Sequence, residues 1–150
     1  MKSYKLFIIT LVLFLFPLTL VAQDINVHNF IGKKQSDVIK KYGKPVHQDN
    51  SNPAMLCMFY KTDSNSMIFV SNADGIYQAE ANESYPNEKK ARKDVSALIS
   101  NSISNGFAID TVSANDFQLR KPGVNVQLQM SDNKITNKYD VRVKANKTES

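Results

Sequence analysis

The feature that most constrains this chain is the two-residue alternation of apolar and polar side chains near its C-terminus. In residues 124–130 and 139–145 the apolar side chains occupy every second position: Val124, Val126, Leu128, Met130, Tyr139, Val141, Val143 and Ala145. A strand sends successive side chains to opposite faces, so the pattern predicts an antiparallel sheet with one buried and one solvated face. Such a sheet needs a cover, and helices elsewhere in the chain must supply it.

Two helices are predicted as that cover. The longer spans about 87–105, where apolar residues fall on a single stripe: Ala91, Val95, Leu98, Ile99 and Ile103. This spacing is typical of an amphipathic helix packed on one side. The shorter helix is predicted to be capped by Ser36 and to end at Gly43, before Pro45, because glycine suits the residue after a helix and proline cannot continue one.

The remaining strand-length segments complete an α+β fold. They lie at about 54–60, 67–70, 76–83, 107–112 and 117–120. Asp74-Gly75 predicts a hairpin between the second and third. The expected order is α-βββ-α-βββ(β), an antiparallel sheet with both helices on one face. The halves, roughly 30–84 and 85–146, share this coarse order, which leaves open two tandem α-β units.

The first 22 residues predict export. Two lysines precede an eleven-residue apolar run, and Ala22 stands before a predicted cleavage point, the pattern of a secretory signal peptide. A retained anchor is the alternative, since an apolar stretch of about 17 residues is at the short limit for a membrane span. We expect cleavage, a polar flexible lead-in over 23–29, and a single α+β domain over 23–150.

Few residues are candidates for catalysis. The single cysteine, Cys57, excludes an internal disulfide and a Cys-based zinc site. Its apolar neighbours predict a buried structural thiol, although a triad of Cys57, His47 and Asp49 can be written. His28, in the expected lead-in, makes a poor metal partner for His47. We therefore predict no enzyme activity, no metal and no cofactor.

Two groups of residues are candidates for binding a partner. The first helix carries Lys33, Lys34, Lys40, Lys41 and Lys44, which suit an anionic surface or an acidic partner. The last hairpin places polar residues on its solvated face: Asn125, Gln127, Gln129, Arg142 and Lys144. We expect the final strand to be a sheet edge. An ordinary solvated surface is the alternative for both groups, and export with a mild net charge disfavours nucleic acid.

A family resemblance adds to this interpretation. Ile31-Gly32, Tyr42-Gly43-Lys44-Pro45, the aromatic pair Phe59-Tyr60 and the segment 68–76 resemble the opening of the SmpA/OmlA (BamE-like) family. The resemblance covers about 31–77. The β-lactamase-inhibitor-like fold is related in architecture and uses two such units. The resemblance implies a small exported scaffold that binds other proteins.

The sequence thus favours a non-enzymatic exported protein, periplasmic or secreted, that binds another envelope or secreted protein. The alternative is a carrier of a small apolar ligand, held between the long helix and the sheet and lined by Met55, Met58 and Phe69. A third hypothesis is an enzyme that uses Cys57 as its nucleophile.

Overall fold

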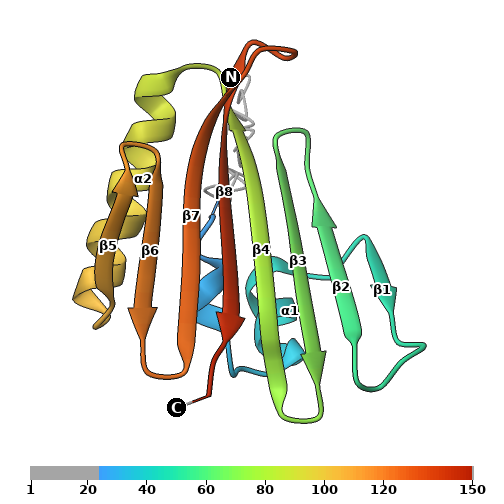
Figure 1. Ribbon diagram of the computed structural model, residues 1–150. Helices are drawn as coiled ribbons and strands as arrows, with labels where there is room; N and C mark the ends of the chain where they lie inside the picture. The colour runs from blue at the N-terminus through green and yellow to red at the C-terminus, as the bar shows by residue number, and fades with distance from the viewer. Residues whose placement is uncertain (1–23, 150) are drawn as a thin grey trace, which may run out of the picture.

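The computed structural model describes residues 24–149, and the predicted signal peptide lies outside the described residues. The elements are η1 (Val27–Phe30), α1 (Gln35–Tyr42), β1 (His47–Asp49), β2 (Leu56–Lys61), β3 (Asn65–Asn72), β4 (Gly75–Tyr85), α2 (Glu88–Ser104), β5 (Ala108–Ser113), β6 (Asp116–Lys121), β7 (Val124–Asn133) and β8 (Lys138–Lys147). The strands form one antiparallel sheet in the order β1-β2-β3-β4-β8-β7-β6-β5 (Figure 1).

The described part of the chain consists of two α-β units. The first contains α1 and β1–β4, and the second contains α2 and β5–β8. The last strands of the two units, β4 and β8, pair at the centre, so the strand order is symmetric about this pair. The α+β prediction is confirmed: the second unit has the optional fourth strand, and the first unit has one strand that the sequence did not predict, β1.

Both helices lie on the same face of the sheet (Figure 1). On α2, Ala91, Val95 and Leu98 are buried as predicted, whereas Ile103 is 56% exposed. At 100° per residue Ile103 lies about 120° around the helix axis from Ala91, so it falls at the flank of the stripe. The buried stripe continues through Ser102 instead.

A cluster of aromatic rings fixes the N-terminal segment to the sheet. Phe69 on β3 is fully buried, and its ring centroid lies 5.6 Å from that of Phe30 and 6.0 Å from those of Tyr42 and Tyr60. Rings at these separations pack well and bury a large apolar area. This packing explains how α1, too short to be stable alone in water, keeps its place.

The loop before α1 is joined to the β3–β4 turn. Gly32 N–H donates to Ile76 O at 2.7 Å, and Ile76 N–H donates to Lys33 O at 2.8 Å. Gly75, in the predicted hairpin, has φ of +113°, and a Cβ there would lie 2.8 Å from Lys33 O. Glycine is therefore required both by the backbone conformation and by the close approach.

Three sequence predictions about this framework are wrong. The segment expected as a flexible lead-in is packed, because Ile25 and Val27 enter the core and are 3% and 0% exposed. The final strand, β8, is central, and the edges are β1 and β5. The first helix is capped at Lys34 rather than Ser36: the Asp37 carboxylate accepts from Lys34 N–H at 3.0 Å.

Candidate functional site

The face of the sheet opposite the helices, the open face, carries a continuous polar surface. The strand register aligns Gln118, Gln127, Lys144 and Glu80 in one row across β6, β7, β8 and β4. Two flanking rows complete what we call the polar platform: Arg120, Asn125, Asn146 and Gln78 on one side, and Asp116, Gln129, Arg142 and Asn82 on the other. The five hairpin residues predicted from the sequence therefore share one face.

Two charges near the centre of the platform, Arg142 and Glu80, are paired with each other. Arg142 donates from Nε and Nη2 to the two oxygens of Glu80, each at 3.0 Å. Asn82 also donates to Glu80 at 3.2 Å. Partial burial acts to raise the pKa of Glu80, but these hydrogen bonds outweigh it and the pKa is lowered. Glu80 thus stays ionised and holds Arg142 in place.

The amides of the platform are less committed than the Glu80–Arg142 pair. Gln118 and Gln127 are half-buried and make no side-chain hydrogen bond to the described residues. Asn125 Oδ1 is buried and has no partner among them. A side-chain amide both donates and accepts, so these groups can pair with a polar partner of either kind.

The open face becomes apolar beyond β4. The central row continues from Glu80 to Ile68 on β3 and Phe59 on β2. Both side chains are half-buried, and the Phe59 ring centroid lies 5.6 Å from that of His47 on β1. Sequence reasoning missed this part of the surface, because both faces of β2 carry apolar residues and the alternation gives no orientation.

Cys57 lies on this apolar part of the open face rather than in the core as predicted. The helix-facing positions of β2 are Met58 and Tyr60, which are buried. Slight burial raises the pKa of the Cys57 thiol, and the charge of Asp49, directly opposite on β1, raises it further. A nucleophilic cysteine needs the reverse shift. The triad residues share a face, but His47 pairs across the strands with Phe59 and not with Cys57.

His28 is a buried residue and not part of a tail. It is 3% exposed, its Nε2 lies 3.2 Å from Ser102 Oγ on α2, and its ring meets Phe107 edge-on at 5.4 Å. Burial lowers the pKa of His28 to about 4, and the charge of Lys121 contributes in the same direction against Asp24. His28 is therefore neutral at physiological pH and links η1 to α2.

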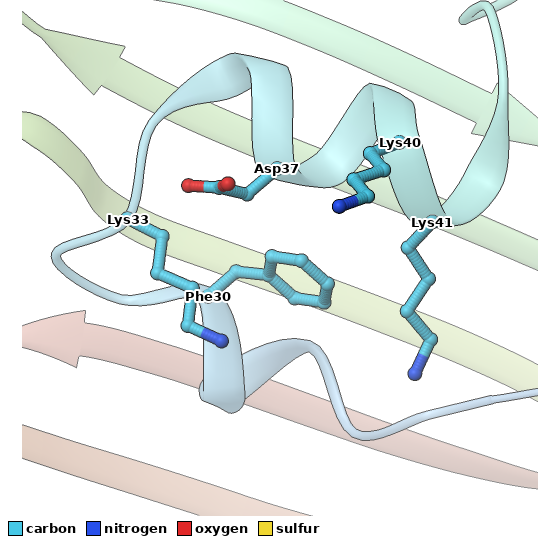
Figure 2. A pocket seen from close by; sticks show the side chains of 5 residues that line it. All are labelled: Phe30, Lys33, Asp37, Lys40 and Lys41. Atoms are coloured by element: carbon cyan, nitrogen blue, oxygen red, sulfur yellow. The ribbon is translucent and has the colours of Figure 1, made fainter.

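The lysines around α1 do not act as one group. Lys33, Lys40 and Lys41 line a hollow of about 600 Å³ together with Phe30 and Asp37. Figure 2 shows the Phe30 ring between Lys33 and Lys41, with Asp37 and Lys40 projecting from α1 above it. Lys34 instead borders a separate hollow beside the β3–β4 turn, and Lys44 lines neither of these two. The helix α1, which carries Lys40 and Lys41, lies on the face of the sheet opposite the polar platform (Figure 1).

The described residues hold neither a cluster of metal-ligating side chains nor a membrane-spanning helix. Within 24–149, no group of three or more His, Cys, Asp or Glu side chains is placed to hold a metal ion. Over the same residues, no helix combines the length and the apolar character that crossing a membrane requires.

Comparisons with known proteins give a distant structural likeness. No family model matches the sequence, and no curated protein matches it. A cysteine-rich secretory protein from Staphylococcus aureus subsp. aureus Mu50 superposes with a TM-score of 0.43 at 14% identity, over 77% of this chain and 44% of that one. An extracellular protein containing a SCP domain from Bacillus anthracis str. Ames gives 0.41 at 16% identity, over 81% and 46%. The chain thus aligns with less than half the length of either protein.

Proposed function

We propose that this chain is an exported, non-enzymatic module that binds another envelope or secreted protein through the open face of its sheet. The observation that carries the proposal is the polar platform, which spans the four strands β6, β7, β8 and β4 without interruption. Export rests on the signal-peptide pattern of residues 1–22.

The geometry of the platform suits a protein partner better than a small molecule. It lies on the central, most fully paired strands, so its side chains are held on a rigid surface. A partner that covers Gln118 and Gln127 must supply hydrogen bonds to their amides, since burying an unpaired amide is costly. Phe59 and Ile68 add an apolar contact beside the polar one, and protein interfaces commonly combine the two.

The paired charges of the platform also predict how binding responds to salt. Glu80 and Arg142 already neutralise each other, so a partner gains little from long-range attraction to either. Screening at high ionic strength should therefore act on binding through Lys144 and Arg120, which form no ion pair among the described residues, and not through the Glu80–Arg142 pair.

Two variants that add the same charge on opposite sides of the sheet test the proposal. Gln127→Arg places a cation in the centre of the platform, and Asn101→Arg places one on the exposed side of α2. Both proteins, tagged at the C-terminus, are used to capture partners from envelope and secreted fractions. We expect a specific protein to be retained by wild type and by Asn101→Arg and lost with Gln127→Arg. Equal retention by both variants would contradict the proposal.

The core packing does not favour the apolar-ligand carrier. Met58 and Phe69, which that hypothesis assigned to the wall of a pocket, are fully buried. The space around Phe69 is occupied by the rings of Phe30, Tyr42 and Tyr60. Met55, the third residue, is 51% exposed.

A further inference from the structure

The hollow beside α1 continues into a second one. The second, of about 540 Å³, shares Phe30, Lys33 and Lys41 with the first and adds residues from the second α-β unit, among them Lys121 and Asn105. We call the two together the lysine groove. It runs from α1 past the end of η1 to the β6–β7 turn, and its cations are Lys33, Lys40, Lys41 and Lys121.

The lysine groove has an excess of available positive charge. Lys40 is exposed and has no hydrogen-bond or ion-pair partner among the described residues. Lys33 and Lys121 lie over aromatic rings, at 5.3 Å from the Phe30 centroid and 4.5 Å from the Phe107 centroid. Such contacts hold an ammonium group in position without neutralising its charge.

The opposing carboxylates are already engaged. Asp24 pairs with Lys41 at 2.5 Å. Asp37 lines the first hollow, where it would repel an anion, but it accepts the Lys34 N–H at 3.0 Å and caps α1. Three lysines therefore remain without a carboxylate partner: Lys33, Lys40 and Lys121.

We propose that the lysine groove binds a linear polyanion that carries a phosphate group in each repeat unit. The first hollow is shallow and the second is more enclosed, and together they form an elongated surface along which a chain can lie. Lysine ammonium groups act as point charges and accept phosphates in many orientations. A polyanion of this kind carries its charges on its backbone, so successive phosphates can face successive lysines of the groove.

The groove is independent of the polar platform, because it lies on the helix side of the sheet. Failure of the protein-binding proposal would leave this one standing, and the reverse also holds.

The test measures binding of inorganic polyphosphate to protein produced from the full 150-residue chain. A triple variant, Lys33→Gln, Lys40→Gln and Lys121→Gln, removes the three uncommitted charges. Its matched control, Lys89→Gln, Lys90→Gln and Lys93→Gln, removes the same charge from exposed positions at the start of α2. We expect the Kd to rise about tenfold or more in the groove variant and less than about twofold in the control. Thermal unfolding establishes that each is folded, and Lys40→Gln alone replaces the groove variant if it is not.

Salt and competing probes complete the experiment. Raising NaCl from about 50 to about 200 mM should weaken polyphosphate binding about tenfold or more, as expected when several phosphates are neutralised. Orthophosphate should bind far more weakly than the polymer. Equal loss in the two triple variants, no polyphosphate binding at low salt, or tighter binding of poly-L-glutamate or of phosphatidylglycerol vesicles would overturn the proposal.

Discussion

Protonation of His28 should destabilise the folded protein as the pH falls. The side chain is 3% exposed and its pKa is lowered to about 4, first by burial and then by Lys121. In the unfolded chain the His28 side chain has its ordinary pKa of 6.5. Between these two values the unfolded state binds a proton that the folded state excludes, so the free energy of unfolding decreases with decreasing pH.

The size of this effect follows from the two pKa values. At about 1.4 kcal/mol per pKa unit, the interval from 6.5 to about 4 corresponds to about 3 kcal/mol. None of this penalty applies above pH 7.5, where His28 is neutral in both states. All of it applies below pH 4. His28→Gln removes the titrating group and with it this part of the pH dependence.

Urea unfolding of wild type, His28→Gln and Ser102→Ala at several pH values between about 7.5 and about 4 measures the effect. At the upper pH His28→Gln should be less stable than wild type by about 1 to 3 kcal/mol, because it loses the edge-on contact with Phe107. Towards pH 4 that difference should shrink by about 3 kcal/mol. Ser102→Ala removes the partner of His28 Nε2 but keeps the imidazole ring. Its plot of unfolding free energy against pH should therefore run parallel to that of wild type. Parallel curves for wild type and His28→Gln would refute the reasoning.

Four further variants have defined outcomes. Glu83 is 1% exposed, and its burial is the largest cause that raises its pKa. The free energy of unfolding of wild type should therefore decrease as the pH rises above about 4.5, and that of Glu83→Gln should not. In urea unfolding, the stability of Glu83→Gln relative to wild type should increase from acid to neutral pH. Gly75→Ala should lower the free energy of unfolding by about 2 kcal/mol or more, because the new Cβ would meet Lys33 O. Gly123→Ala, whose Cβ would meet open space, should lower it by about 1 kcal/mol. Thermal unfolding measures both. Cys57→Ser should change stability by less than about 1 kcal/mol, and the native thiol should react with iodoacetamide more slowly than a free cysteine, because its pKa is raised.

The strands and the long helix were predictable because their patterns are local. Alternation over 124–130 and 139–145 corresponds to β7 and β8, and the stripe from Ala91 to Leu98 corresponds to the buried side of α2. The hairpin signalled by Asp74-Gly75 was also correct, although the two turn residues are Ala73 and Asp74 and Gly75 already pairs with Asn72. Each of these depends on periodicity or turn chemistry, which a single segment contains in full.

Burial of short segments was not predictable, because it depends on distant partners. Ile25 and Val27 sit among polar residues, and only packing of η1 against β4 and β8 shows that they belong to the core. The prediction of which β2 side chains face the core was wrong for a related reason. Its two faces are equally apolar in sequence, and the position of the helix layer decides that Met58 turns inward and Cys57 outward.

The candidate sites required the order of the strands. The sequence placed Gln127 and Arg142 on one face, but not Glu80, because nothing local shows that β4 lies beside β8. The lysine groove could likewise not be predicted, because it forms only where Lys121, at the β6–β7 turn, lies near the end of η1. Charge clustering along the chain grouped Lys34 and Lys44 with the groove lysines, although their side chains lie outside it.

Site-specific photo-cross-linking in the cells that produce this protein tests the central claim most directly. A benzophenone side chain replaces Gln127 on the polar platform in one protein and Asn101 on the exposed side of α2 in another. The account predicts that position 127 cross-links to one defined envelope or secreted protein and that position 101 does not. Cross-links from position 101 alone, or from neither position, would contradict binding through the open face.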